Sequence, residues 1–222
     1  MTVILVLATF LVFIVVDYML HRGQVKQPQP AVQLRDVSVS QPAYVDGFLV
    51  PANLRYHPGH SWLMRERTRR VRVGIDEFAA ALMGGIERIE LPKPGVWVRQ
   101  GQKALKFFRG GESAEMLSPT EGEVIEVNPE VVRDPTLIRR DPYGQGWIMV
   151  MDVPDEETMN RNLVPVTMVR NWVRDAVERL YGQQPQLAGA VAADGGRPAD
   201  DLLAGMPDAN WKKVTDEFFL TA

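Results

Sequence analysis

The side chains that are best suited to chemistry in this sequence have a spacing that indicates no catalytic or metal centre. His57 and His60 are close along the chain, but Pro58 and Gly59 between them indicate a turn, and the only other histidine is His21. The chain has no cysteine, which excludes disulfides, thiolate metal ligands and a cysteine nucleophile. No nucleophile elbow, phosphate loop or metal-ligand spacing is present. The sequence therefore predicts neither an enzyme nor a metal site.

Charged side chains are the next candidates. The paired carboxylates Glu156-Glu157 and Asp200-Asp201 fall in segments that read as loops, and Lys93 lies in a Leu-Pro-Lys-Pro-Gly turn. All of these are interpreted as solvated charges. The formal net charge of −3 and the pI near 5.7 argue against nucleic-acid binding, which usually requires a basic surface.

The elements around these residues begin with an expected membrane anchor at 1–21. Residues 2–20 are apolar apart from four positions, and as a helix they would span roughly 30 Å, the thickness of a bilayer core. A cleaved signal peptide is the alternative, but it needs a basic start and a small-residue cleavage site. Basic residues follow the span and none precedes it, which predicts a single-pass protein of the cell (inner) membrane with its bulk in the cytoplasm. Asp17 either reaches the interface or pairs with a polar group of a neighbouring membrane helix.

Five further segments follow the anchor. Residues 22–47 form a linker rich in Pro and Gln, and 48–157 form the folded unit. Residues 158–182 have apolar positions at helical spacing, Trp172 among them. This amphipathic helix either packs on the domain, which is the favoured interpretation, or binds a partner. Residues 183–204 are expected to be a flexible linker and 205–222 a docking segment, with Asp208 as a helix cap and with Trp211 and Phe218 on one face. That segment binds either a partner or its own domain.

The folded unit contains short segments of β-type periodicity, separated by turns rich in Gly and Pro. The expected strands are 61–65, 70–75, 86–91, 103–109, 122–127 and 147–151. Between the second and third strands we expect a short helix, capped by Asp76 and ended by Gly84. Many short strands with regular turns predict a compact, mainly β barrel or sandwich.

Five motifs in this unit, in order, resemble the glycine cleavage H-protein family: YHPGHSW (56–62), VGIDEFA (73–79), ELPKPGVWVRQGQ (90–102), LSPTEGEVIEVN (117–128) and DPYGQGW (141–147). The resemblance covers about residues 54–157. It implies a barrel-sandwich hybrid of the lipoyl/biotinyl type, in which a hairpin presents one lysine for lipoate. The lipoyl arm of such a carrier moves an aminomethyl group between partner enzymes, and the carrier itself catalyses nothing.

The chain departs from the family at the lysine itself. The resemblance implies a lysine ten residues after Gly101 and eight before Pro119, and both counts give Gly111. Gly110-Gly111 suits a two-residue hairpin turn, because both residues tolerate positive φ. Arg109 cannot replace the lysine, because its guanidinium stays protonated. We therefore expect no cofactor, with lipoate on Lys103 or Lys106 as the alternative.

Two functions follow from these observations. The first is a non-catalytic, non-lipoylated adaptor or accessory subunit of a membrane-associated protein complex. Its expected partner-binding residues are Asp17, Arg109, Glu112, Trp172, Trp211 and Phe218. The second is a lipoyl group carrier of a glycine-cleavage-like or redox system, modified at an atypical lysine.

Overall fold

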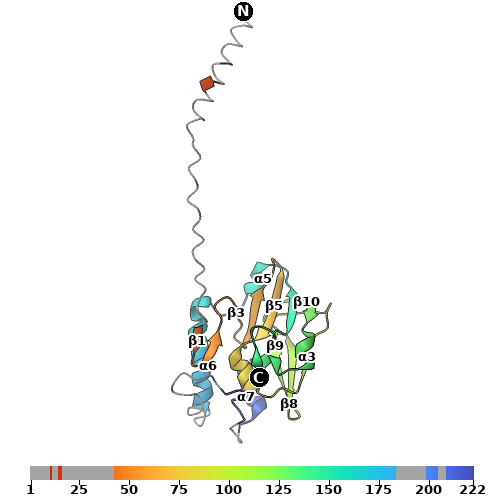
Figure 1. The fold of residues 1–222 in the computed structure, drawn as a ribbon, viewed down its shortest axis with the longest axis vertical. Helices are drawn as coiled ribbons and strands as arrows, with labels where there is room; N and C mark the ends of the chain where they lie inside the picture. Colours follow the sequence, from red (N-terminus) through yellow and green to blue (C-terminus); the bar gives the residue numbers. More distant parts are fainter. Residues whose placement is uncertain (1–10, 12–14, 17–42, 184–198, 205–208) are drawn as a thin grey trace, which may run out of the picture. The chain divides into compact units, whose positions relative to one another are not determined.

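The structure is a computed structural model that describes residues 11, 15–16, 43–183, 199–204 and 209–222 (Figure 1). Asp17 and most of the expected membrane anchor lie outside the described residues. Among the residues that are described, no helix is long and apolar enough to cross a membrane. The chain divides into two units, Met1–Gln41 and Pro42–Ala222, and the fold described below is that of the second.

The strands of this unit form three antiparallel sheets. A two-stranded sheet pairs β1 (Ala43–Val45) with β2 (Phe48–Val50). A six-stranded sheet has the order β3 (Arg55–Tyr56), β4 (Ser61–Arg65), β5 (Arg70–Ile75), β11 (Met149–Asp152), β10 (Gly122–Val127) and β7 (Trp97–Val98). A three-stranded sheet has the order β6 (Arg88–Glu90), β8 (Lys103–Arg109) and β9 (Glu112–Leu117).

The helices in the described part are mostly short. They are α2 (Glu77–Met83), α3 (Pro129–Arg133), α4 (Leu137–Arg140), α5 (Glu156–Asn160), the 3-10 turn η1 (Val166–Met168), α6 (Val169–Gln183) and α7 (Trp211–Phe218). Together with the sheets they confirm the mainly β fold with short helices that the sequence predicts (Figure 1).

Helix α2 is the centre of the packing. All seven of its residues are buried, and it contacts β2, α4 and α7. Its start and end are those expected from the sequence. The Asp76 carboxylate accepts a hydrogen bond from the Ala79 amide at 2.8 Å, which satisfies one of the free N–H groups at the helix start. Gly84 follows the last turn with φ of 63°. The small alanines of α2 let neighbouring elements approach it closely.

Four expected strands have the bounds that the sequence pattern gave them: β4, β5, β8 and β10. Two differ, because β6 covers only Arg88–Glu90 and β11 is shifted to Met149–Asp152. The expected helix at 158–182 is shorter at its start, because α6 begins only at Val169, and it continues to Gln183, one residue past the expected stop at Gly182. The expected cap Asp208 lies outside the described residues, and the side chain of Asn210 caps α7 by accepting from the Lys213 amide.

Candidate functional site

The β8–β9 hairpin is the element on which the expected function depends. Its register pairs Arg109 with Glu112 across the turn and Phe107 with Ala114 further along. Leu105, Phe107 and the β9 side chains opposite them are fully buried, so one face of the hairpin packs on the core. Alternation along the strands turns the next residues outward. The hairpin is therefore anchored by the face that packs on the core, and its opposite face is partly exposed.

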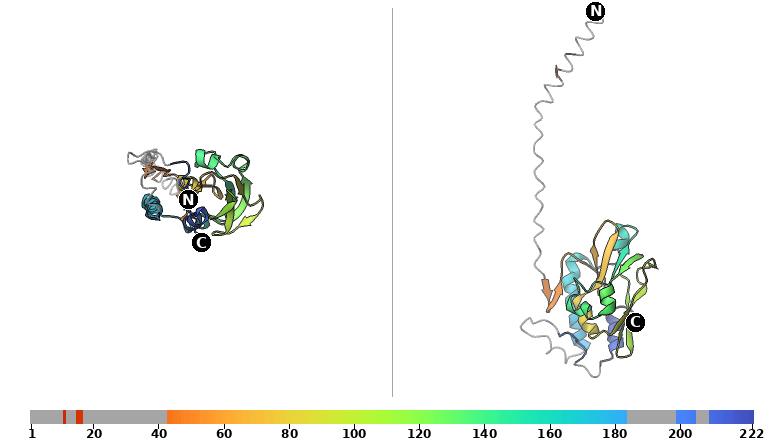
Figure 2. Two further views of the ribbon diagram at one scale, coloured as in Figure 1. Left: turned by 90° about the horizontal axis from the view of Figure 1, so that it is seen from below. Right: turned by 45° about the vertical axis from the view of Figure 1, so that its right-hand side comes forward.

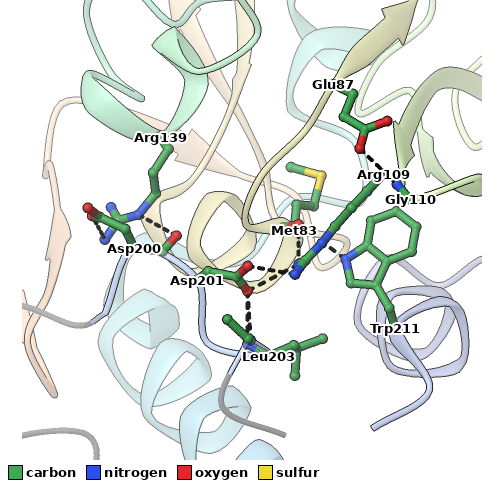
Figure 3. Close-up of polar contacts among 10 residues, drawn as sticks. Met83, Glu87, Arg109, Gly110, Arg139, Asp200, Asp201, Leu203 and Trp211 are labelled. Atoms are coloured by element: carbon green, nitrogen blue, oxygen red, sulfur yellow. Dashed lines mark hydrogen bonds and ion pairs between the residues drawn. The ribbon is translucent and has the colours of Figure 1, made fainter. Parts of the chain in front are cut away.

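The hairpin turn consists of Gly110 and Gly111, with φ of 55° and 84°. Two consecutive positive φ angles confirm the two-residue turn that the sequence predicts. The Glu87 carboxylate accepts a hydrogen bond from the Gly110 amide at 3.2 Å (Figure 3). A Cβ built on either glycine would meet no atom of the described part of the chain within 4 Å. The turn is thus fixed by hydrogen bonding and is open to an approaching molecule.

Two lysines lie on β8 below the turn. The Lys103 side chain is 49% exposed, its Nζ donates to the Thr221 carbonyl at 2.7 Å, and it is 3.7 Å from the Glu115 carboxylate. Lys106 is partly buried, pairs across the strands with Glu90 and Glu115, and has its Nζ 5.3 Å from the ring centroid of Phe108. Both amines belong to the body of the sheet, four or more positions before the turn begins at Gly110.

Arg109, the last residue of β8, faces away from solvent toward α2 and the C-terminal segment. Its Nη1 donates to the Met83 carbonyl at 3.0 Å, and its two terminal nitrogens bind the Asp201 carboxylate at 3.1 and 2.6 Å (Figure 3). Each side chain of this pair is 24% exposed. A bidentate guanidinium–carboxylate pair fixes direction as well as distance. The residue next to the turn is therefore held to the chain's own C-terminal segment.

Asp200, the neighbour of Asp201, is bound by a second arginine. Nη2 of Arg139 in α4 lies 3.1 Å from the Asp200 carboxylate, and Nε donates to the Asp200 carbonyl at 3.2 Å (Figure 3). Arg139 also forms a buried ion pair with Glu77 of α2 at 3.4 Å. Asp200 and Asp201 therefore both form ion pairs. The Asp200 side chain is 88% exposed and is solvated as the sequence suggested, whereas Asp201, at 24%, departs from that expectation.

Helix α7 packs on the domain beside the hairpin, against β9 and α2. Figure 2 shows this C-terminal helix, drawn in dark blue, close to the β domain in both views. The Trp211 indole N–H donates to the Met83 carbonyl at 3.1 Å, and Trp211 is 6% exposed. Phe218 is 1% exposed and meets Phe78 edge to face at 5.3 Å. The docking segment was expected to bind either a partner or its own domain, and in the structure its helix α7 packs on its own domain.

Trp172, on α6, extends the same aromatic cluster. Its ring stacks on His60 with centroids 4.5 Å apart, and His60 is also 4.7 Å from Phe78. Nδ1 of His60 is 2.7 Å from the Asp76 carboxylate. Nδ1 of His57 accepts a hydrogen bond from the Gly59 amide, and burial together with the nearby His60 lowers the pKa of His57 to about 4. Both histidines are thus built into the packing.

Of the expected site residues that the structure describes, four lie in one region around α2, and Glu112 lies apart from them. Arg109, Trp211 and Phe218 meet around α2, and Trp172 on α6 is connected to Phe218 through the His60 ring. Glu112 is exposed at the start of β9, next to the turn. Sequence reasoning missed Glu87, Arg139, Asp200 and Asp201 as parts of this region. The one available signal for the aspartates was their adjacency just before a run of Leu residues, which is too common to identify a contact.

Comparison with known proteins gives consistent matches. The family model described as "Glycine cleavage H-protein" matches residues 54–176, more than half of the 222-residue chain. The glycine cleavage system H proteins of Xanthomonas campestris pv. campestris (strain B100) and Xanthomonas oryzae pv. oryzae (strain PXO99A) are each 35% identical over 116 residues, 52% of this chain and 88% of the relative. A crystal structure of a glycine cleavage system H protein from Mycobacterium marinum is 28% identical, with a TM-score of 0.45, over 48% of this chain and 87% of that one.

These matches correct two expectations. The prediction of no cofactor is wrong, because it conflicts with the matched family, whose glycine cleavage H proteins carry lipoate. The turn itself does not fit an amide-linked lipoyl group, because Gly111 has no side-chain amine. The prediction of an inner-membrane location is also wrong, because the matched relatives are glycine cleavage system H proteins and give a membrane location no support.

Proposed function

This chain belongs to the glycine cleavage H-protein family, and from that premise we propose that it is a non-catalytic module that binds a protein of a glycine-cleavage-type system through its β8–β9 hairpin. The observation that carries the proposal is that the Gly110-Gly111 turn is both held in place and open. Gly110 is held by Glu87, and Arg109 is held by Met83 and Asp201. No atom of the described residues covers the turn on the side where a Cβ would point.

Such a hairpin is pre-organised for docking. A rigid projection loses little conformational entropy when a partner binds it, so more of the contact energy appears as affinity. The exposed Glu112 adds a negative charge beside the turn, and a charge at the rim of an interface acts mainly on the association rate and on specificity. The hairpin thus offers a partner the open backbone of its glycine turn and one carboxylate.

Binding to the glycine-decarboxylating and aminomethyl-transferring enzymes of such a system tests the proposal. The purified chain is titrated against each enzyme by biolayer interferometry, alongside the variants Glu112→Arg and Glu126→Arg. Glu126 is an exposed residue of β10 in a different sheet, so its reversal changes the net charge equally. We expect Glu112→Arg to weaken binding about tenfold and Glu126→Arg to have little effect. Equal effects of the two variants would remove the hairpin from the interface.

A second candidate function, a lipoyl carrier, is supported by the two amines on β8. When attached, lipoate supplies a disulfide-containing arm that carries the transferred group. Lys103 has the more exposed side chain, and Lys106 lies closer to the turn. Either lysine would place the start of the arm on the outer side of the three-stranded sheet. The Thr221 carbonyl and the Glu115 carboxylate near Lys103 would have to release its amine first.

Intact mass and peptide mapping test this second function. The chain is produced with lipoate and a lipoate-attaching enzyme, as the wild type and as the variants Lys103→Arg, Lys106→Arg and Gly111→Lys. A lipoyl mass increase that is lost in only one of the two arginine variants would identify the carrier lysine. If Gly111→Lys gains a lipoyl group and the wild type does not, lipoate on the β8 lysines is refuted. The open space around Gly111 accommodates the substitution, at a cost of about 1–2 kcal/mol for its positive φ.

A further inference from the structure

The C-terminal residues 199–204 and 209–222, together called the strap, lie across the face of the β domain that borders the hairpin. The Leu202 amide donates to the Ala81 carbonyl at 3.0 Å. Leu202 and Leu203 are almost fully buried, as are Val214 and Phe219 further along. The strap begins well past residue 176, where the match to the family model ends. It is therefore a feature of this chain that the family resemblance does not explain.

Two arginines from separate elements hold the acidic end of the strap. Arg109 ends β8 and binds Asp201, while Arg139 in α4 binds Asp200. The amides of Leu203 and Ala204 also donate to the Asp201 carboxylate, at 3.1 and 3.0 Å. Asp201 is thus held by a bidentate pair with a cation of the β domain. Asp200, whose side chain is 88% exposed, is paired at the surface by Arg139, which also pairs with the buried Glu77. This is a charge-complementary site for an acidic segment.

Aromatic side chains hold the other end of the strap. The Met83 carbonyl accepts hydrogen bonds from both the Trp211 indole and Arg109, so the aromatic and acidic contacts share one atom of the domain. Phe218 packs on Phe78, and the Arg179 guanidinium lies 5.2 Å from the ring of Phe218. Buried aromatic residues and arginines are the side chains that dominate recognition surfaces.

We propose that this face, formed by Phe78, Met83, Arg109 and Arg139, is a recognition site for acidic peptide segments followed by an aromatic helix, and that the strap occupies it in competition with such a segment of a partner protein. The strap is joined to α6 by residues 184–198, which are rich in Ala, Gly and Pro. A tethered ligand of this kind acts at an effective concentration of about millimolar. A partner segment therefore gains access when it binds more tightly or when the strap's own pairs are weakened.

This inference shares its location with the proposed hairpin function, because Arg109 lies next to the turn. Its test uses no glycine-cleavage enzyme, so either proposal can fail alone. A fluorescein-labelled peptide of residues 199–222 is titrated by anisotropy against the full chain. The chain is used as the wild type, as Asp200→Asn/Asp201→Asn, and as Glu156→Gln/Glu157→Gln, which removes the same charge from the start of α5.

We expect the labelled peptide to bind the Asp200→Asn/Asp201→Asn chain at least about tenfold more tightly than the other two chains, because the weakened strap competes less. A peptide that itself carries both asparagines should bind that variant about tenfold more weakly, and the preference should decrease at high salt. Equal binding to all three chains, or no binding to any of them, overturns the proposal.

A measurement on the unaltered chain complements the variants. Hydrogen exchange of the Leu203 and Ala204 amides reports strap release, because both donate to Asp201 in the docked state. Excess unlabelled peptide should speed their exchange, since a displaced strap cannot redock at once. Unchanged exchange with the peptide in large excess contradicts the competition.

Discussion

A single methyl group at Gly84 should report how the strap packs on the β domain. Gly84 follows α2 with φ of 63° and ψ of −131°, a conformation that costs other residues about 1–3 kcal/mol. A Cβ there would also collide with the Asp201 carboxylate and with Nη1 of Arg109. Because the paired side chains are each 24% exposed, we assign their loss about 1 kcal/mol. Gly84→Ala should therefore lower the free energy of unfolding by about 2–4 kcal/mol.

Gly85→Ala is the matched control, because a Cβ at Gly85 would meet no atom within 4 Å. Urea unfolding followed by circular dichroism measures both variants, and the control should stay within about 0.5 kcal/mol of the wild type. In the double variant Gly84→Ala/Asp201→Ala the collision with the carboxylate is absent, so its destabilisation should be smaller than the sum of the single effects. Similar losses for both glycines, or strict additivity in the double variant, would refute the packing described for Asp201.

Three further changes follow from the packing. Because folding lowers the pKa of His57 to about 4, the folded chain favours the neutral imidazole. The free energy of unfolding should therefore be highest above about pH 6.5 and decrease by about 2–3 kcal/mol toward pH 4. His57→Asn should abolish this decrease in urea titrations across this range. Phe218→Ala should cost about 3–5 kcal/mol in thermal or urea unfolding, whereas Leu220→Ala, at a residue that is 50% exposed, should cost under about 1 kcal/mol. Gly74→Ala should cost at least about 2 kcal/mol by calorimetry, because its Cβ would overlap the Trp62 indole.

Local patterns predicted the elements whose structure is determined locally. The alternation in Arg70–Ile75 and Lys103–Arg109 reappears as β5 and β8, and Asp76 caps α2 as expected. The hairpin turn at Gly110-Gly111 was equally predictable from the sequence, because tolerance of positive φ is a property of the residue type. The short strands β1 and β2 were not predicted, since three residues carry too little periodicity to be recognised.

Contacts between residues that are far apart in the chain could not be predicted from the sequence. Asp201 is 92 residues from Arg109, and the backbone carbonyl of Asp200 is 61 residues from Arg139. In the sequence both aspartates have the composition of a solvated linker, and only the folded chain brings the two arginines to them. Gly84 shows the same limit. Its role in ending α2 was predicted, but the close approach of Asp201 that also requires a glycine was not.

Hydrogen exchange of the chain with and without the aminomethyl-transferring enzyme tests the proposed hairpin function most directly. Binding through the β8–β9 turn should slow exchange at the amides of Gly110, Gly111 and Glu112, which lie at the open end of the hairpin. The exposed edge around Trp97 on β7 should remain unchanged. Protection at β7 without protection at the turn would contradict a hairpin-based interaction, and so would an enzyme that leaves every amide unaffected.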